Sequence, residues 1–402
     1  MDSKFSRVSR MFLFLVCFIC IAGPVKRSDA SGPDCTSLLA DTPPAKPHSP
    51  EGKQPKHVFI IVLENESFDA TFGKTSQAPY LNCLAQQRGK LLDQYYAIGH
   101  NSLDNYIAMV SGQAPDTNTQ SDCSVYFDFR ADPAPPDADG QVAGNGCVYP
   151  ASVKTVANQL DNAHLTWRGY MESMEHGYKN MLDDNGKCEH PHIGDRDDSS
   201  GAVPGHQYAA KHNPFVYFHS IIDDPKVCAS DVPLTDLTND LKSAKTTPNL
   251  AFISPNLCDD GHDDHCAGAP AGETDGLAAA DRFLQKWVPE IMKSPAYQDD
   301  GMLIITFDEA DLGDNQQDFA SCCGEKPGPN SASPGQGGPG GGRIGAVIMS
   351  PFVKPGPPAD STPYNHYSLL KSIEVLFDLK PLGYAGQKGL KEFGPDVYDA
   401  KP

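Results

Sequence analysis

The first residues whose types and spacing could do chemistry are Glu64 and Asn65. They follow directly after Val58 to Leu63, a continuous apolar run rich in β-branched residues. A run of this kind is typical of a strand covered on both faces, and sites in open α/β sheets are built at the carboxyl ends of strands. A carboxylate and an amide at that position could hold a hard metal ion or a polar substrate group. The alternative is that Glu64 caps the next turn and Asn65 forms it.

A second apolar run, Met302 to Phe307, ends in the same way at Asp308 and Glu309. Parallel strands of one sheet would bring both polar pairs to the same edge. Clustered carboxylates raise one another's pKa unless a cation lies among them. We therefore expect a divalent metal ion, of a kind the sequence does not specify, held by Glu64, Asn65, Asp308 and Glu309. The alternative is two unrelated helix N-caps, where acids are common.

A candidate nucleophile lies in the polar segment HNSLDNY, residues 100–106. Ser102 could begin a helix, where free backbone N–H groups and the helix dipole favour an anion. A serine hydroxyl needs a metal ion or a nearby base for activation. Asn105, three residues later, could turn its amide toward the same anion. The alternative is that Ser102 is an ordinary N-cap, and the chain has no GxSxG elbow that would indicate an α/β-hydrolase.

Three histidines stand in polar segments that could reach the same place. They are His212 before Asn213-Pro214, His262 in the acidic segment DDGHDDH, and His366 after Asn365. Histidine can donate to phosphoryl oxygens, bind a metal ion or protonate a leaving group. For each histidine taken alone, a surface or capping role is the alternative.

Strand-like and helix-like segments alternate along the chain, which predicts an α/β fold with a mainly parallel central sheet and helices on both faces. Further strands are expected at 91–97, 165–171, 250–254 and 344–350. Helices are expected at 78–89, 153–162, 234–242, 276–292 and 367–378. The polar residues 113–150 are expected to pass over the site, and 312–343, rich in Pro, Gly and Ser, to be the least structured part.

The 402 residues divide into three expected parts. Residues 1–30 have a basic start, an apolar core and small residues at the end, which predicts a signal peptide. Residues 31–56 are expected to form an extended lead-in, and 57–402 a single catalytic domain. No later segment is long and apolar enough to span a bilayer, so no stable membrane insertion is expected after signal removal.

Cysteine usage and charge agree with an exported protein. Two of the 12 cysteines lie in the signal, and the remaining 12 − 2 = 10 predict disulfides. Cys123 with Cys147 and Cys258 with Cys266 would close local loops, and a zinc site has little support without a CxxC pair. The net charge of −20 argues against nucleic-acid binding and against docking on anionic membranes.

Together these stretches resemble the phosphoesterase family of bacterial phospholipases C and acid phosphatases, which belongs to the alkaline-phosphatase-like superfamily. The chain carries the family's EN-x-SFD-xx-FG motif at 64–73, its serine and asparagine at 102 and 105, and its Asp-Glu pair at 308–309. The segments at 212–215, 255–263 and 364–377 are also similar to the family. The resemblance covers about residues 57–385 and is greatest to the short secreted acid phosphatases, some of which act on phosphoinositides.

The resemblance implies a role for each candidate residue. Ser102 would be the phosphorylated nucleophile and a metal ligand. The rest of the metal shell would be Glu64, Asn65, Asp308 and Glu309. The phosphate contacts or leaving-group acids would be Asn105, His212, His262 and His366, with Asp263 as a weaker candidate. The family's phospholipases usually follow the Asp-Glu pair with a Gly-rich segment containing Asp-His, whereas Ala310 to Gly313 follow here.

The resemblance and the site residues predict a secreted or periplasmic, metal-dependent acid phosphatase. It would hydrolyse phosphate monoesters through a phosphoserine, and its partner would be a small phosphate ester or a phospholipid head group. One alternative is a phosphodiesterase of the phospholipase C type. An alternative from another class is a secreted protein that binds a metal ion or ligand without catalysis.

Overall fold

The computed structural model describes residues 34–44, 54–176, 181–182, 186–263, 265–267, 276–311, 318–335, 338–353, 355–356 and 362–398. The predicted signal peptide lies outside the described residues. The chain divides into two compact units, residues 1–34 and 35–402, and the second unit contains all the elements described below. Within the described residues, no helix combines the length and the apolarity that crossing a membrane requires.

Seven strands of the described chain form one central sheet, in the order β11-β7-β12-β1-β13-β14-β2. Their bounds are Asp231–Pro233 (β11), Trp167–Met171 (β7), Leu250–Ser254 (β12), His57–Leu63 (β1), Gly301–Phe307 (β13), Ala346–Met349 (β14) and Lys90–Leu92 (β2). The five strands from β11 to β13 are parallel to one another, while β14 is antiparallel to both of its neighbours. The predicted mainly parallel sheet is therefore confirmed.

The two strands predicted to carry the polar pairs are direct neighbours. Strands β1 and β13 pair in parallel, with Leu63 opposite Phe307. Both strands are buried almost throughout, as their apolar, β-branched sequences require. Because the strands end at the same level, the next residues of each strand leave the sheet side by side.

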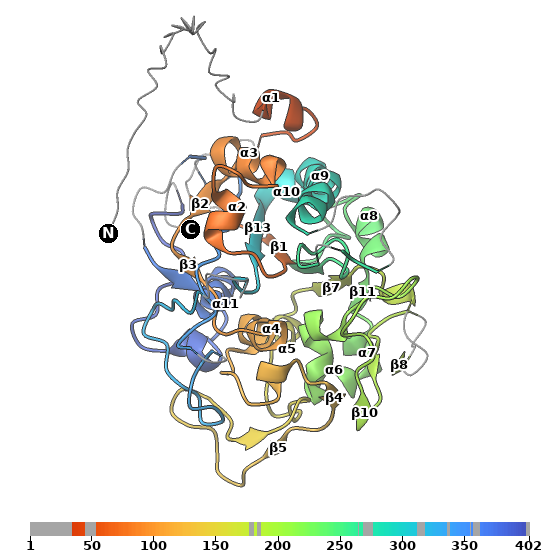
Figure 1. The fold of residues 1–402 in the computed structure, drawn as a ribbon, viewed down its shortest axis with the longest axis vertical. Helices are drawn as coiled ribbons and strands as arrows, with labels where there is room; N and C mark the ends of the chain where they lie inside the picture. The colour runs from red at the N-terminus through yellow and green to blue at the C-terminus, as the bar shows by residue number, and fades with distance from the viewer. Residues whose placement is uncertain are drawn as a thin grey trace, which may run out of the picture. The chain divides into compact units, whose positions relative to one another are not determined.

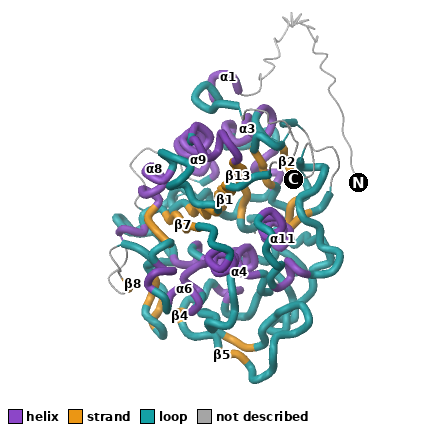
Figure 2. The backbone as a smooth tube through the Cα atoms, turned by 180° about the vertical axis from the view of Figure 1, so that it is seen from behind, coloured by secondary structure: helices purple, strands orange, loops and turns teal. Residues whose placement is uncertain are grey.

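Helices cover both faces of the sheet, as predicted (Figures 1 and 2). One group consists of α3 (Pro79–Gln87), α9 (Leu277–Lys293) and α10 (Pro295–Asp300), which contact one another and the strands β1, β2, β13 and β14. The other group contains α4 (Ser102–Ser111), α5 (Val156–Asn162) and α11 (His366–Leu376), with α4 touching both of the others. Helix α4 is buried along its whole length, so its first turn lies inside the protein.

The remaining elements are short and belong mostly to connections. The helices are α1 (Cys35–Leu38), α2 (Phe68–Phe72), α6 (His219–Ile222), α7 (Pro225–Cys228) and α8 (Leu237–Asp240). The 3₁₀ helices are η1 (Thr119–Ser121), η2 (Met174–His176), η3 (Ala210–His212), η4 (Pro214–Tyr217), η5 (Leu234–Asp236) and η6 (Gly383–Gly386). Small two-stranded sheets pair β10 (Asp195–Arg196) with β4 (Val125–Tyr126), β15 (Tyr364–Asn365) with β3 (Tyr95–Tyr96), β5 (Arg130–Ala131) with β6 (Gly144–Asn145), and β8 (Met181–Leu182) with β9 (His190–Pro191).

Three predicted segments differ in detail from the structure. The strand expected at 91–97 is split, because Tyr95 and Tyr96 leave the central sheet to pair with β15. The helix expected at 234–242 begins as the 3₁₀ turn η5 before it becomes α8, which is common at helix starts. Part of the lead-in, expected to be extended, forms the helix α1, whose Cys35 is bonded to Cys83 of α3.

Five disulfides join the ten cysteines of the described chain. The two local pairs predicted from the sequence, Cys123–Cys147 and Cys258–Cys266, are both present. The other three bonds are Cys35–Cys83, Cys188–Cys228 and Cys322–Cys323. The last of these joins adjacent residues, so it closes no loop, whereas the first ties α1 to the sheet-covering helix α3.

Candidate active site

Glu64 and Asp308 meet at the carboxyl edge of the sheet, where β1 and β13 end. Both side chains are completely buried. Asp308 Oδ1 accepts hydrogen bonds from the backbone nitrogens of Asn65, at 3.1 Å, and Glu309, at 2.7 Å. Asn65 turns the chain in a left-handed conformation, with φ of 46°, which asparagine tolerates better than most residues. The predicted meeting of the two strand ends is therefore present.

Ser102 is the first residue of α4, and its hydroxyl points at Glu64. Ser102 Oγ donates to Glu64 Oε2 at 2.8 Å, and Tyr106 OH donates to Glu64 Oε1 at 2.5 Å. Positions four residues apart share one face of a helix, which explains why both hydroxyls reach the same carboxylate. Asn101, not Ser102, occupies the N-cap position, and Ser67 caps α2. The capping alternatives for Ser102 and Glu64 therefore do not describe this structure.

Asn105 shapes the loop that precedes the helix. Its amide oxygen accepts from the backbone nitrogens of Ile98 and Gly99, and its amide nitrogen donates to the carbonyls of Gly99 and Asn101. These four bonds use the whole hydrogen-bonding capacity of the amide. Its predicted contact with phosphate stays a prediction, while the geometry shows that Asn105 positions the backbone leading to Ser102.

His212, in η3, lies beside Glu64, and His262 lies in the loop after β12. The His212 ring stacks on Tyr106, with ring centres 5.5 Å apart, and its Nε2 is 3.3 Å from Glu64 Oε2. Neither ring nitrogen makes a hydrogen bond to the described residues. Burial, with the nearby Lys211 and His262, holds the pKa of His212 well below its usual range. His262 is exposed, so the two histidines approach the same site from the interior and from the surface.

His366, the first residue of α11, contacts other protein groups through both of its ring nitrogens. Its Nε2 lies 2.6 Å from the Asp308 carbonyl oxygen and its Nδ1 lies 3.2 Å from Tyr95 OH. Burial lowers its pKa to about 4. The predicted role of His366 as a phosphate contact or proton donor stays a prediction, since both of its ring nitrogens are engaged in supporting the turn after β13.

Glu309 faces away from Asp308 toward the loop before α4. Its carboxylate lies 2.6 Å from His100 Nδ1 and accepts from the Asn101 backbone nitrogen at 3.0 Å. His100 is itself buried, with its other nitrogen 2.9 Å from the Asp318 carbonyl. No helix begins after β13 at Asp308, so these acids are not N-caps of a following helix. Glu309 instead joins the end of β13 to the start of α4.

The site concentrates buried negative charge. Burial, together with Asp308 and Asp260, holds the pKa of Glu64 well above its usual range, and burial also raises the pKa of Asp308 and Glu309. Lys211 is a buried cation near these acids, bonded to Asp122. Burial opposes its charged form, but Asp122 and Glu64 raise its pKa. A further positive charge at this edge would be stabilising.

The donors at the edge fit a hard divalent cation in part. Among the described residues, no group of three or more His, Cys, Asp or Glu side chains is arranged to hold a metal ion. One end of the Asn65 amide lies 2.9 Å from Glu64 Oε2 and 3.2 Å from Asp308 Oδ1, and the other lies 3.3 Å from His262 Nε2. With its nitrogen at the first end, the amide donates to both carboxylates. With its oxygen there, three oxygen ligands face one another, which is favourable only around a cation.

Five residues of the site had no assigned role in the sequence analysis. They are His100, Tyr106, Asp122, Lys211 and Asp260. Two signals could have found some of them: Tyr106 is one helical turn after Ser102, and Lys211 directly precedes His212. Asp122 gives no such signal, because its approach to α4 depends on a turn closed by the Cys123–Cys147 disulfide.

Comparison with known proteins found one matching family and several relatives. The model of the Phosphoesterase family matches residues 74–380. A probable acid phosphatase of Kluyveromyces lactis is 27% identical over 357 residues, which is 89% of this chain and 64% of that protein. A phosphatidylinositol-3-phosphatase of Mycobacterium tuberculosis is 25% identical over 329 residues, 82% of this chain and 79% of that protein. The chain thus spans less than two thirds of the yeast relative.

The comparison with solved structures also returned a protein of the alkaline phosphatase superfamily from Vibrio parahaemolyticus. It is 15% identical, with a TM-score of 0.42, and the alignment covers 86% of this chain and 74% of that one.

Proposed function

Because this chain belongs to the Phosphoesterase family, we propose that it is a secreted phosphatase that hydrolyses phosphate monoesters through a phosphoserine at Ser102. The observation that carries the proposal is the hydrogen bond from Ser102 Oγ to Glu64 Oε2, at the first turn of a buried helix. A hydroxyl placed this way has a carboxylate beside it and the positive end of the helix dipole behind it, the combination that favours attack on an anionic ester. The acid phosphatases among the relatives support the same class of reaction.

The proposed reaction has two steps. Ser102 Oγ attacks the phosphorus atom as its proton passes to water, the bond between phosphorus and the ester oxygen breaks, and the alcohol leaves with a proton taken from a histidine. Water then attacks the phosphoserine, which releases phosphate and restores the Ser102 hydroxyl. Glu64 orients the hydroxyl in the first step. His262 is the histidine best placed to protonate the alcohol, because it is exposed at the edge where Asn65 also reaches the surface.

The reaction also calls for a divalent cation, which Glu64, Asn65 and Asp308 would hold. When bound, the ion supplies positive charge that favours the serine alkoxide and balances charge on the phosphoryl oxygens. Glu309 supports the site from its other side through His100 and the Asn101 backbone. The engagement of Glu309 with these groups favours a ligand set without it.

Export of the protein is part of the proposal. Five disulfides are present among the described residues, and such bonds persist in oxidising compartments. Head groups of phosphorylated lipids are one substrate class to test, since one relative is a phosphatidylinositol-3-phosphatase.

The test is hydrolysis of a chromogenic phosphate monoester across pH by the wild type, Ser102→Ala and Ser111→Ala. Ser111 is a matched control, since it is buried at the other end of the same helix. We expect Ser102→Ala to lose activity while remaining folded, Ser111→Ala to keep it, and a chelator to inhibit the wild type. Mass spectrometry after an acid quench should find a phosphoryl group on Ser102.

Three results would overturn the proposal. Equal activity in the wild type and Ser102→Ala would exclude the serine as nucleophile. Turnover of choline or inositol diesters without monoester hydrolysis would replace the phosphatase with a phosphodiesterase, and binding of metal without any turnover would indicate a binding protein.

A further inference from the structure

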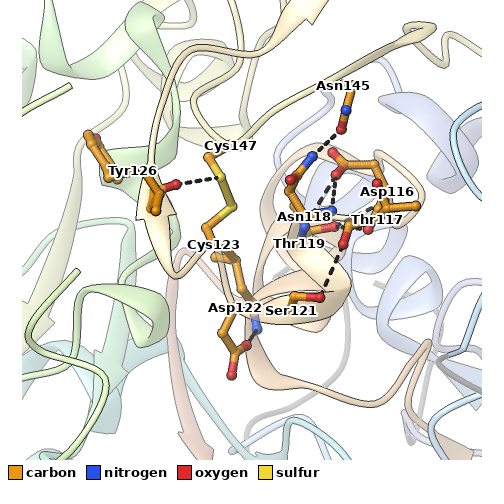
Figure 3. Close-up of a disulfide and its surroundings, with 12 residues drawn as sticks. Asp116, Thr117, Asn118, Thr119, Ser121, Asp122, Cys123, Tyr126, Asn145 and Cys147 are labelled. Atoms are coloured by element: carbon orange, nitrogen blue, oxygen red, sulfur yellow. Dashed lines mark hydrogen bonds between the residues drawn. A yellow bond between two sulfur atoms is a disulfide. The ribbon is translucent and has the colours of Figure 1, made fainter. Parts of the chain in front are cut away.

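Asp122 lies at the end of a hydrogen-bonded turn next to the Cys123–Cys147 disulfide (Figure 3). Asp122 and Cys123 both adopt left-handed backbone conformations, with φ of 50° and 46°. The turn is held by the Asp116 carboxylate, which accepts from the backbone nitrogens of Asn118 and Thr119. The Cys123–Cys147 disulfide closes it. These bonds fix a conformation that a free chain would rarely adopt, so the position of the Asp122 carboxylate is set by its surroundings.

The Asp122 carboxylate joins two parts of the site. Its Oδ1 accepts from the Leu103 backbone nitrogen at 3.1 Å, and its Oδ2 accepts from Lys211 Nζ at 3.0 Å. Leu103 follows Ser102 directly, and its nitrogen is one of the first-turn groups that have no partner within their own helix. Lys211 directly precedes His212. The carboxylate therefore fixes the helix start on one side and η3 on the other.

Asp122 performs a task that the N-cap residue of α4 does not. The Asn101 side chain makes no cap hydrogen bond to the first turn; its Nδ2 donates to the Gln120 carbonyl at 2.5 Å instead. Asn101 thereby ties the helix start to the turn that carries Asp122. The cap of α4 is supplied by a residue 19 positions further along the chain.

We infer that Asp122 is a positioning residue for the nucleophile: it clamps the first turn of α4 so that Ser102 Oγ stays directed at the phosphorus atom, and Lys211 holds the clamp in place. This inference rests on the proposed function, since it assigns Ser102 the attack. A small displacement of a reacting group can cost about 100-fold in rate. A clamp of this kind should therefore act on kcat and the phosphorylation step, with little effect on substrate binding.

Asp281 offers a matched control in the other helix group. Its carboxylate accepts from the backbone nitrogens of Tyr80 and Leu81, in the first turn of α3, at 3.1 and 2.9 Å. Asp281 is buried, and α3 carries none of the proposed site residues. Asp281→Ala therefore removes the same kind of contact from a helix that does not carry the nucleophile.

The experiment compares kcat, KM and the single-turnover rate of Ser102 phosphorylation in Asp122→Ala, Asp122→Asn, Lys211→Met, Lys211→Arg and Asp281→Ala. The substrate is a chromogenic monoester, and urea unfolding is measured for each variant. We expect Asp122→Ala to lower kcat and the phosphorylation rate by about 10- to 100-fold, with KM within about threefold of wild type. Asp122→Asn keeps an acceptor for Leu103 and should lose less, and Lys211→Arg should recover most of what Lys211→Met loses.

The controls separate positioning from stability. Asp281→Ala should destabilise the protein without lowering kcat. A kcat for Asp122→Ala equal to the wild type, or an equal loss of kcat in Asp281→Ala, would overturn the inference. If Asp122→Ala does not fold, Asp122→Asn is the variant that tests the inference. A change in its KM with kcat unchanged would contradict a positioning role. Ser102→Ala measured in parallel shows whether the proposed function itself has failed.

Discussion

At the scale of single residues, His366 and His212 are similar in burial and opposite in bonding. Both imidazole rings lie within the site and are nearly inaccessible to solvent. His366 contacts the Asp308 carbonyl and Tyr95 OH, whereas neither nitrogen of His212 has a hydrogen-bond partner among the described residues. The nitrogens of His212 have only longer contacts, Nε2 at 3.3 Å from Glu64 Oε2 and Nδ1 at 3.7 Å from Asp260 Oδ2. His366 is therefore the more firmly hydrogen-bonded of the two rings.

This contrast predicts unequal losses of stability. His366→Ala and His212→Ala would leave cavities of similar size, but only the first also removes two buried hydrogen bonds, each contributing about 1 kcal/mol. We expect His366→Ala to reduce the free energy of unfolding by about 2 kcal/mol more than His212→Ala does. Urea unfolding of both variants under one set of conditions measures the difference. Equal losses would show that the His366 contacts contribute no net stability.

The sequence predicted which residues belong to the site better than it predicted their hydrogen-bond partners. The strand-end pairs stand out because they end apolar runs, and Ser102 because it lies at an expected helix start. The structure brings Glu64, Asp308 and Ser102 together. The sequence could not show that Asn105 would use its whole amide on backbone groups 98–101. These hydrogen-bond partners depend on the path of the loop, and the spacing of residues in the sequence does not determine that path.

At the scale of elements, strands and long helices were predictable because each carries its own apolar pattern. The parallel arrangement of β1 and β13 in one sheet was predictable from their buried apolar sequences, whereas their direct pairing is a finding of the structure. The split of the strand expected at 91–97 was not predictable, because Tyr95 pairs with Tyr364, whose position depends on the far end of the chain.

The helix α11 contains a buried acid that should make the free energy of unfolding depend on pH. Glu374 is fully buried, its Oε1 accepts from the Leu382 backbone nitrogen at 2.8 Å, and burial raises its pKa from the ordinary 4.5 to about 9. The folded state therefore keeps a proton that the unfolded chain releases in this pH range. The stability linked to Glu374 is fully present below pH 4.5 and is lost as pH rises toward 9.

Glu374→Gln should remove this dependence while keeping an acceptor for Leu382. We expect the variant and the wild type to respond alike to urea at acid pH, and the variant to become progressively more stable than the wild type up to about pH 9. Urea midpoints of both proteins, measured at intervals between these limits, give the difference. A difference that stays constant with pH would show that the Glu374 carboxyl is not held in its neutral form.

At the scale of the whole molecule, the net charge and the presence of disulfides were predictable from the sequence, but most of the disulfide connectivity was not. The net charge of −20 and the even number of cysteines follow from composition. Of the disulfides, only the two short-range pairs could be proposed, because connectivity over long separations depends on the fold. The bond from Cys35 to Cys83 spans 48 positions, whereas Cys322–Cys323 spans one.

These two bonds should contribute very unequally to stability. A disulfide stabilises mainly by restricting the unfolded chain, and a separation of 48 residues corresponds to roughly 2–4 kcal/mol, while a bond between neighbours restricts almost nothing. The double variant Cys35→Ser with Cys83→Ser should lose about that amount in urea unfolding, and Cys322→Ser with Cys323→Ser should stay within about 0.5 kcal/mol of wild type. Equal losses in the two variants would mean that native contacts at the sulfurs, not chain restriction, determine what each disulfide contributes.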